Sequence, residues 1–416
     1  MTENAKKDSP EQTEFRRHCQ DWLKNNTPHA PDFRMPKNGI ELMTQEQIDY
    51  TSAWNKAAYD AGLVGCDYPK DVGGGGMKDC QIIANAEMRK AKTPPLPNPI
   101  GLGMGAPTVF FHGSDELKKR LLPKLFSGEE VWCQGFSEPG TGSDLASVQT
   151  FAEKKGDKWI INGHKVWTSC AHFATWMILL ARTDKSDKYN GLSYFVVPIK
   201  SELGKSVTVR PLIKITGETG FNEVIFDDLE IDDNFRLDDV GSGWKVAMTT
   251  LDHERGAGVY LTPESGGLAG TRAESKVTGK KKEYALVTLA KACMRNGKPA
   301  IEDPILVDKI MEALVFSMGI KQQRRMRSVK PLVENPQRLG LQDKLIGTDY
   351  VQLMSEVAME ITGAHGTLYT GDDNAPDSGK WPLSYLSSFA GTIAGGTNEI
   401  QRNILGERVL GLAKSK

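Results

Sequence analysis

A segment rich in glycine and hydroxyl side chains, Phe136–Asp144, has the composition of a loop that binds a ligand. Glycines allow a backbone to approach a bound molecule closely, because they carry no Cβ atom. Hydroxyl groups for hydrogen bonds are offered by Ser137, Thr141 and Ser143. Taken alone, the segment also fits an ordinary loop of small turn residues. Trp167 and Ser169, which follow further along the chain, favour the ligand-binding interpretation.

Two carboxylates and an arginine on one predicted helix form a second group that could do chemistry. The segment Thr249–Arg255 contains Asp252 and Glu254 as well as its terminal arginine. Acidic and basic neighbours on a helix are most often a surface ion pair. In a ligand site, however, a carboxylate can act as a general base and an arginine can hold a phosphate oxygen.

Four segments in this order resemble the acyl-CoA dehydrogenase family. Phe136–Asp144 together with Trp159–Ser169 is similar to the family's flavin-binding middle domain. Thr249–Arg255 is similar to the helix that follows this domain, and Ile393–Ile404 is similar to the closing signature of the family. A further segment, Glu360–Gly366, resembles the loop that contacts the adenosine pyrophosphate. The resemblance covers nearly the whole chain and implies FAD-dependent oxidation of an acyl-CoA thioester to the trans-2-enoyl-CoA.

The resemblance implies a set of contacts to FAD. The residue matching Ser137 contacts the pyrimidine end of the flavin, Trp167 packs on the ring system, and Ser169 bonds near N5, where hydride arrives. An isoalloxazine ring needs an aromatic neighbour and a few hydrogen bonds to tune it. The cofactor-binding residues that the resemblance implies are Phe136, Ser137, Gly142, Ser143, Trp167, Thr168, Ser169, Arg295, Gly363, Gly366, Thr397 and Glu399.

The predicted catalytic base follows from a departure in the closing signature. Many family members carry a catalytic glutamate directly before the Gly-Thr pair, but this chain has Gly395 there, which cannot take a proton. The isovaleryl-type branch places its base on the helix after the β domain, and the matching residue is Glu254. We therefore expect Glu254 to remove the α-proton. The resemblance implies that Ser143, Asp252, Arg255 and Gly395 contact the substrate, the last through its backbone N–H.

A second departure concerns the arginine that reaches the FAD of a neighbouring subunit in the family. The nearest match to its Arg-x-x-Phe-Gly segment is Met294–Pro299, in which Arg295 takes the place of the arginine. This match lies further from Glu254 than usual, because an insertion at about 262–290 stands between them. Pro263 would break the helix there. The insertion shapes either the pocket mouth or a subunit contact.

Two other functions stay open beside dehydrogenation. A redox-neutral or eliminating relative fits the empty base position, and a non-catalytic subunit that completes a partner's FAD site fits the altered Arg295 region. The resemblance implies electron-transferring flavoprotein as the acceptor. It also implies a homotetramer, a dimer of dimers, or a hetero-oligomer with a related subunit. Ala394 and Gly395 are small, so a branched or cyclic acyl group is one hypothesis for the substrate.

The pattern along the chain predicts an α+β multidomain protein. Residues 1–130 are expected to form a helical domain, 131–240 a small β-barrel or sandwich, and 241–416 a second helical domain. The run Lys158–Trp167 predicts a hairpin, because Asn-Gly is a strong turn signal between two β-rich runs. A stripe at helical spacing predicts a core face at Val307, Ile310, Met311, Leu314, Val315 and Met318. The basic run Lys321–Arg327 predicts a solvated or subunit-facing turn.

Composition narrows the class of protein. Apolar residues make up 39% and charged residues 25% of the 416 residues, as in a globular protein of two or three domains. The net charge of -1 favours neither nucleic acid nor an anionic membrane, and no apolar run is long enough for a spanning helix. The polar N-terminus predicts no signal peptide. Six scattered cysteines without a C-x-x-C pair predict no metal site and favour the cytoplasm.

Overall fold

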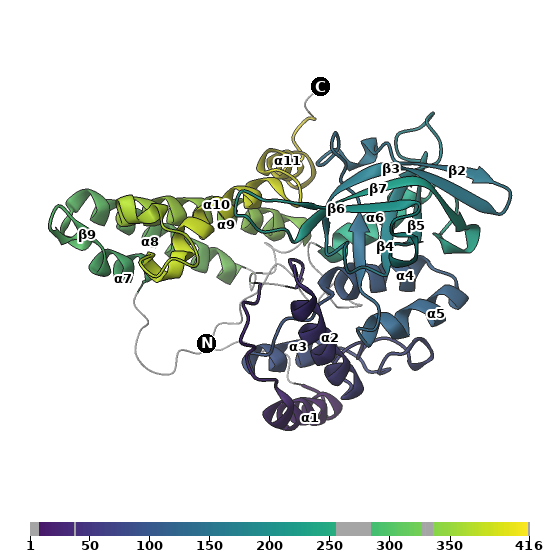
Figure 1. The fold of residues 1–416 in the computed structure, drawn as a ribbon, viewed down its shortest axis with the longest axis horizontal. Helices are drawn as coiled ribbons and strands as arrows, with labels where there is room; N and C mark the ends of the chain where they lie inside the picture. Colours follow the sequence, from purple (N-terminus) through teal and green to yellow (C-terminus); the bar gives the residue numbers. More distant parts are fainter. Residues whose placement is uncertain (1–7, 37–38, 255–283, 327–328, 330–335, 415–416) are drawn as a thin grey trace. The chain divides into compact units, whose positions relative to one another are not determined.

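The computed structural model describes residues 8–36, 39–254, 284–326, 329 and 336–414 (Figure 1). These residues group into two compact units. The first unit holds the described residues among 1–214 and 218–271, and the second holds those among 215–217 and 272–416. Arg255 and most of the predicted insertion lie outside the described residues. The predicted order of a helical, a β and a second helical region is confirmed, while the boundaries at 130 and 240 stay predictions.

The helices of the first unit begin where the sequence supplies capping side chains. Ser9 and Thr44 each accept a hydrogen bond from the backbone three residues on and form a capping box with Gln12 and Gln47. The helices are α1 Pro10–Asn26, α2 Gln45–Asp60, α3 Gln81–Lys90, α4 Ala106–His112, α5 Asp115–Phe126 and α6 Gly243–Asp252. A π-helical turn, η2 Gly101–Gly105, leads into α4, and the short 3-10 turns are η1 Lys70–Val72, η3 Leu145–Ser147, η4 Lys200–Glu202 and η5 Asp233–Phe235.

Within the described residues, one eight-stranded sheet forms the centre of the first unit. Its strands are β1 Trp132–Gly135, β2 Phe151–Lys155, β3 Lys158–Ser169, β4 Trp176–Arg182, β5 Leu192–Pro198, β6 Val207–Leu212, β7 Phe221–Asp232 and β8 Arg236–Leu237. The strand order is β6-β7-β3-β2-β4-β5-β8, and β1 also pairs with β4. Strands β4 and β5 are buried along almost their whole length, which explains their continuous apolar sequences. Helix α6 packs on β4 and β5, and α4 packs against α6 (Figure 1).

The predicted hairpin at Lys158–Trp167 is wrong. Asn162 and Gly163 lie inside the single strand β3, and the reversal of the chain occurs earlier, at Gly156, between β2 and β3. A bulge replaces the expected turn, because the register with β7 shifts between Ile161 and Gly163. The Asn162 amide and Asp228 exchange two hydrogen bonds of 2.8 Å at the bulge. The Asn-Gly pair therefore bends a strand here and does not connect two strands.

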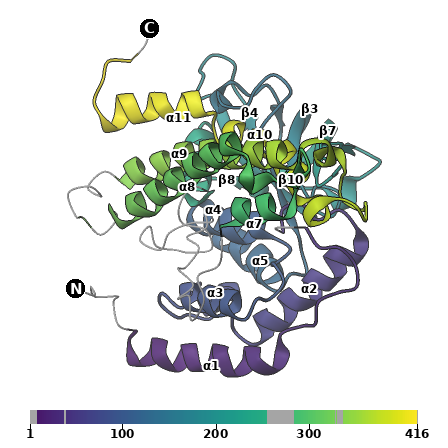
Figure 2. The same cartoon turned by 90° about the vertical axis from the view of Figure 1, so that its left-hand side faces the viewer.

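The second unit contains long helices and a small hairpin. In both views α8, α9 and α10 run side by side (Figures 1 and 2). The elements are α7 Ala285–Ala292, β9 Met294–Arg295, β10 Lys298–Pro299, α8 Pro304–Arg325, α9 Pro336–Thr362, α10 Lys380–Ile393 and α11 Asn398–Ile404. The short turns are η7 Ala300–Glu302, η10 Gly363–Thr367, η11 Pro376–Gly379 and η12 Leu405–Val409. Leu286, Ile310, Val357, Ile361 and Trp381 belong to the core of this unit.

The predicted core stripe on α8 is confirmed at Ile310 and wrong at its exposed members. The buried residues are Leu306, Ile310 and Ala313, which pack in the core with α7 and α9. Met311, Val315 and Met318 are 49%, 63% and 54% exposed. The helix is apolar on several sides, so a helical period alone could not identify the side that α9 covers. The basic run does not form a turn in its described part either, because α8 continues through Arg325.

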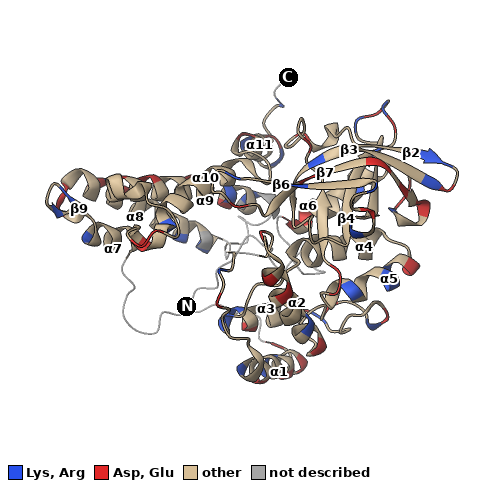
Figure 3. Cartoon of the chain, in the orientation of Figure 1, with Lys and Arg blue, Asp and Glu red and all other residues tan. Residues whose placement is uncertain are grey.

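Acidic and basic positions both occur on the helices and strands of each unit, and the whole chain carries a net charge of -1 (Figure 3). Among the described ranges, no helix combines the length and the apolar character needed to cross a bilayer.

The bulge in β3 generates a prediction about Gly163. A Cβ atom at this position would stand 2.4 Å from Thr150 Oγ1 and 2.7 Å from its Cα atom. We expect Gly163→Ala to lower the free energy of unfolding by about 1–3 kcal/mol, because the clash involves backbone. Gly140→Ala is the control, because nothing lies within 4 Å of its added Cβ. Urea denaturation measures both variants, and equal stabilities would contradict the prediction.

Candidate functional site

A buried ion pair organises the glycine-rich segment Phe136–Asp144. Lys165 on β3 is 0% exposed, and its Nζ lies 2.8 Å from Glu138 Oε1 and 3.0 Å from the Phe136 carbonyl oxygen. The other hydrogen bonds to the Glu138 carboxylate come from the backbone N–H groups of Gln149 and Thr150, at 2.6 and 2.9 Å. The charged carboxylate thereby accepts three hydrogen bonds, one of them from a cation. A single acidic side chain thus ties the segment to β3 and to the start of β2.

Burial and pairing have opposite effects on the pKa values of Lys165 and Glu138. Burial lowers the pKa of Lys165 to about 8, although the charge and hydrogen bond of Glu138 raise it. Burial by itself raises the pKa of Glu138, but the Lys165 ammonium and the backbone donors outweigh it and hold this pKa below its usual value. Both groups are therefore charged at neutral pH, and each depends on the other to remain buried.

The end of β3 presents the predicted flavin residues. Trp167 has a left-handed φ of 59° and is 59% exposed, and its ring meets that of Phe221 edge to face at 6.1 Å. Thr168 is fully buried, and its Oγ1 has no hydrogen-bond partner among the described residues. Ser169 is 5% exposed. An exposed indole beside an orphaned buried hydroxyl suits a planar ligand with polar edges, so these residues fit a flavin.

The rest of the predicted flavin segment lies at the same end of the sheet. The backbone N–H of Val166 donates to the Ser137 carbonyl at 2.9 Å, which joins the segment to β3 next to Trp167. Phe136 is buried, and its ring meets that of Tyr194 edge to face at 5.9 Å. Gly142 and Ser143 are exposed beyond the tight turn that Glu138 and Thr141 close with two backbone hydrogen bonds. The structure therefore brings the middle-domain predictions together.

The predicted base lies just after α6. Asp252, the last residue of α6, is exposed, whereas Glu254 is half-buried on a π-type turn that continues the helix. The negative charge of Glu254 contributes to raising the pKa of the buried Tyr194 phenol, after burial itself. Glu254 is therefore close enough to the core of this unit to act on its electrostatics. Arg255, the fourth predicted substrate residue, lies outside the described residues.

A histidine at the end of α4 forms a hydrogen bond with α6. His112 Nε2 lies 2.8 Å from Thr249 Oγ1, and its Nδ1 lies 3.2 Å from Asp238 Oδ2. Because a carboxylate only accepts, Nδ1 carries the proton in the neutral ring and Thr249 donates to Nε2. Burial lowers the pKa of His112, more than the hydrogen bond and charge of Asp238 raise it. The neutral ring is therefore the favoured form in the folded protein.

The closing signature lies in the second unit. Gly395 and Gly396 have left-handed φ angles of 66° and 85°, which glycine adopts without strain. The Gln401 amide donates to the Gly395 carbonyl at 2.7 Å, and Lys344 Nζ donates to the Gly396 carbonyl at 2.9 Å. Thr397 caps α11, because its Oγ1 accepts from the Ile400 N–H at 3.3 Å.

Thr397 and the exposed Glu399 border a hollow of about 290 Å³ in this second unit. The remaining lining residues are Asp349, Gln352, Thr392, Ile393, Asn398 and Arg402. Polar groups predominate among them, so the hollow suits a polar group and not an acyl chain.

Two other predictions also fall in the second unit. Gly363 has a φ of 53°, and a Cβ atom on Gly366 would stand 2.7 Å from Thr362 Oγ1, so both positions of the Glu360–Gly366 segment need glycine. Arg295 lies on the β9–β10 hairpin and forms an ion pair of 3.0 Å with Asp303. This guanidinium therefore already has an acidic partner within the chain.

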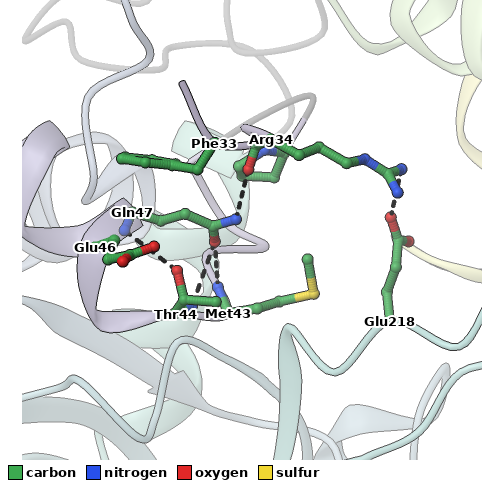
Figure 4. Close-up of a pocket in the computed structure, with 8 residues that line it drawn as sticks. Phe33, Arg34, Met43, Thr44, Glu46, Gln47 and Glu218 are labelled. Atoms are coloured by element: carbon green, nitrogen blue, oxygen red, sulfur yellow. Dashed lines mark hydrogen bonds and ion pairs between the residues drawn. The ribbon is translucent and has the colours of Figure 1, made fainter. Parts of the chain in front are cut away.

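A hollow of about 250 Å³ in the first unit contains none of the predicted residues (Figure 4). Arg34 and Glu218 face each other across it at 3.6 Å, and the Gln47 amide hydrogen-bonds to the backbone that lines it. Among the described residues, none of its lining side chains has an orphaned buried polar atom, and none belongs to the predicted site, so we take the end of β3 as the candidate functional site.

Sequence reasoning missed Lys165 and Glu138. A signal was present, because Lys165 stands at a core-facing position of a strand, where a lysine needs an acidic partner. It also missed Lys344, which fixes the closing signature, and that residue has no comparable signal within its helix.

Comparisons with known proteins place all three regions of the chain in one family. The acyl-CoA dehydrogenase N-terminal, middle and C-terminal domain models match residues 9–129, 133–232 and 284–410. The chain is 36% identical over 406 residues to acyl-CoA dehydrogenase IpdE1 of Mycobacterium tuberculosis strain H37Rv, covering 96% of this chain and 98% of that protein.

Solved structures share the fold over the whole chain. The Tcur3481-Tcur3483 steroid ACAD gives a TM-score of 0.71 at 23% identity and covers 98% of this chain and 99% of that chain. The ChsE4-ChsE5 complex of Mycobacterium tuberculosis gives a TM-score of 0.68 at 23% identity and covers 99% and 100%.

The buried pair generates a prediction for a double-mutant cycle. We expect Glu138→Gln and Lys165→Met each to lower the free energy of unfolding by about 3–5 kcal/mol, because each leaves a buried charge unpaired. The double variant is expected to lose less than the sum, since neither charge remains. Chemical denaturation of the four proteins checks this, and additive losses would show that the two charges do not depend on each other.

The His112 network generates a prediction about pH. The folded-state pKa lies below the ordinary 6.5, so the stability that neutral His112 provides is complete above about pH 6.5 and is lost as the pH falls through the lower folded value. We expect His112→Gln to cost about 1 kcal/mol at pH 7.5. The difference from wild type should shrink at pH 5.5, because only the wild type carries this titration. Urea denaturation at both pH values measures it, and a difference that grows at low pH would contradict it.

Proposed function

Because this chain belongs to the acyl-CoA dehydrogenase family, we propose that it oxidises an acyl-CoA thioester to the trans-2-enoyl-CoA with FAD as cofactor. The observation that carries the proposal is the exposed ring of Trp167, whose backbone has a left-handed φ of 59°, at the end of the strand that also carries Thr168 and Ser169. An exposed indole in a strained conformation suits a site that stacks on a planar ring.

The residues that would hold FAD are those at the end of β3 and in the segment that Glu138 ties to it. Trp167 offers a stacking surface, Thr168 and Ser169 offer hydroxyls, and Ser137 precedes the tight turn of the glycine-rich segment. In the second unit, Gly363, Gly366, Thr397 and Glu399 are the proposed contacts to the rest of the cofactor, with Thr397 and Glu399 beside a polar hollow. When bound, FAD supplies the acceptor for the β-hydrogen of the substrate, which leaves as a hydride.

Glu254 is the proposed base that takes the α-proton. A base on this residue fits a sequence in which Gly395 has no side chain for the task, and Glu254 is half-buried at the end of α6. The thioester oxygen gains negative charge as the proton leaves, and a backbone N–H can stabilise that charge. We assign this role to the Gly395 N–H, whose peptide has a left-handed geometry held by Gln401. Ser143, Asp252 and Arg255 are the proposed contacts to CoA.

The proposed substrate carries a bulky acyl group, branched or cyclic. A Cβ atom added at Gly395 would meet nothing within 4 Å among the described residues, so this position leaves space where other family members place a glutamate. The name of one structural neighbour, a steroid ACAD, is consistent with this class, although at 23% identity that likeness shows the fold alone. The proposed electron acceptor is electron-transferring flavoprotein, and six free thiols support a cytoplasmic location.

A second candidate function is that of one subunit in a hetero-oligomer whose partner completes the FAD site. The ion pair between Arg295 and Asp303 favours it, because this guanidinium is already neutralised within its own chain. One structural neighbour is a complex of two different chains, ChsE4-ChsE5. A homo-oligomer, as a dimer of dimers, is the corresponding proposal if the single chain binds FAD by itself. A redox-neutral reaction at the same site would leave the flavin oxidised.

An anaerobic absorbance titration tests the proposal. Purified wild type is mixed with butyryl-, octanoyl-, isovaleryl- and cyclohexanecarbonyl-CoA and with a steroid-derived acyl-CoA. We expect bleaching of the flavin band by a branched or cyclic thioester, and at least about 100-fold slower bleaching in Glu254→Gln, because general-base catalysis contributes about 100- to 10,000-fold.

Glu116→Gln is the matched control, since Glu116 is exposed on α5. Bleaching retained in Glu254→Gln would move the base elsewhere, and preference for straight chains would overturn the substrate class. A colourless wild-type protein would favour the partner-subunit candidate, and bound FAD without bleaching would favour the redox-neutral one.

A further inference from the structure

Three buried hydroxyl groups meet next to the predicted base. Thr250 Oγ1 on α6 lies 2.9 Å from Tyr194 Oη on β5 and 2.9 Å from Thr108 Oγ1 on α4. All three side chains are 0% exposed. Thr108 Oγ1 in turn donates to the Met104 carbonyl, at 2.7 Å, in the π-helical turn η2. This hydroxyl chain connects a strand with two helices and a π-turn inside the first unit.

The donors and acceptors of the hydroxyl chain run in one direction. Thr108 gives its only proton to the Met104 carbonyl, so its oxygen accepts from Thr250. Thr250 has then used its proton, so it accepts from Tyr194. The Val246 carbonyl, at 3.3 Å, is a weaker alternative acceptor for Thr250. Every hydroxyl proton has an acceptor in this order, and removing the Thr250 hydroxyl leaves the buried Tyr194 phenol without its acceptor.

An apolar core would serve packing equally well at this place. Valine has the shape of threonine and phenylalanine has that of tyrosine, and neither carries a polar group that needs a partner. Hydrogen bonds are directional, whereas apolar contacts are not. The hydroxyl chain therefore fixes the rotation of α6 about its axis and its position along that axis relative to β5 and α4. Thr250 is the geometric centre of this fixation, because it contacts both other members.

The hydroxyl chain also joins the predicted base to the predicted flavin segment. Glu254 lies one helical turn after Thr250, and its charge acts on the Tyr194 phenol. On the other side, the Tyr194 ring packs edge to face against Phe136, the first residue of the glycine-rich segment. Tyr194 therefore contacts the segment that would hold the flavin and the helix that carries the base.

We propose that Thr250, Tyr194 and Thr108 are positioning residues that set the place of the Glu254 carboxylate relative to the flavin segment. The proposal rests on the proposed function, because it takes Glu254 as the base. A shift of about 1 Å in a reacting group can cost about 100-fold in rate, so a loosened α6 should slow proton removal without weakening substrate binding. The hydroxyl, and not the volume, of Thr250 is the required feature.

The test compares Thr250→Val, Tyr194→Phe and Thr250→Ser with the control Thr51→Val. Thr51 is also a fully buried helical threonine of the first unit that donates to the carbonyl four residues earlier, but it lies on α2. Stopped-flow reduction by the acyl-CoA that bleaches wild type fastest gives the rate and the dissociation constant separately. Hydrogen–deuterium exchange of residues 243–254 in the FAD-free proteins gives a readout that does not depend on catalysis.

We expect Thr250→Val and Tyr194→Phe to reduce flavin at least about tenfold more slowly with a dissociation constant within about threefold of wild type. Thr250→Ser should restore the rate, and deuterium uptake of α6 should rise in Thr250→Val but not in Thr51→Val. Equal rates and equal uptake in Thr250→Val and Thr51→Val would overturn the proposal while wild-type bleaching leaves the proposed function intact. If no acyl-CoA bleaches wild type, the proposed function fails, and unchanged uptake would then overturn the positioning role separately. Should Thr250→Val not fold, Tyr194→Phe and Thr250→Ser carry the same comparison.

Discussion

The buried ion pair between Lys165 and Glu138 is the constraint on which the site at the end of β3 depends. Two charges are held out of water at 2.8 Å, and the carboxylate also accepts hydrogen bonds from two backbone N–H groups. Neither charge can be buried alone without a large loss of stability, because a buried charge without its partner is costly. It fixes the start of the glycine-rich segment, and the backbone bond from Val166 to Ser137 then places Trp167 beside that segment. The exposed Trp167 is thus held in place by buried residues.

Much of the fold could be predicted from the sequence, because the spacing of apolar residues indicates which parts of a helix or strand are buried. The capped helices, the buried strands β4 and β5 and the order of the regions follow from local patterns. Two predictions failed because the structure at these positions depends on a neighbouring strand or helix and not on the local sequence. Asn162 and Gly163 carry a turn signal, but β7 pairs with β3 on both sides of them and converts the turn into a bulge. Several sides of α8 are apolar, and only the packing of α7 and α9 selects the one that is buried.

The sequence predicts the motif residues of the candidate site but not the residues that support them. Short motifs with glycines, hydroxyl groups and an aromatic residue predict ligand-facing residues, because glycine allows a bound molecule to approach the backbone closely. The supporting groups Lys165, Lys344 and Thr250 carry no motif, since their roles arise from contacts between distant parts of the chain. Thr250 is one of two adjacent threonines on α6, and only the structure shows that one meets His112 and the other Tyr194. A helix held on two sides by neighbouring residues has little freedom to rotate.

The bulge in β3 makes this strand sensitive to insertions and deletions as well as to substitutions. Lys165 is buried and Trp167 is exposed although they are two residues apart, because a second register shift against β7 interrupts the alternation between Lys165 and Thr168. The loss of one residue near Gly163 would shift the strand by one position, bring Val166 to the place of Lys165 and leave Glu138 with an aliphatic neighbour. The same slip would carry the indole toward the interior. Natural variation should therefore be tolerated in the side chains of the exposed face of β3 long before it is tolerated in the length of the strand.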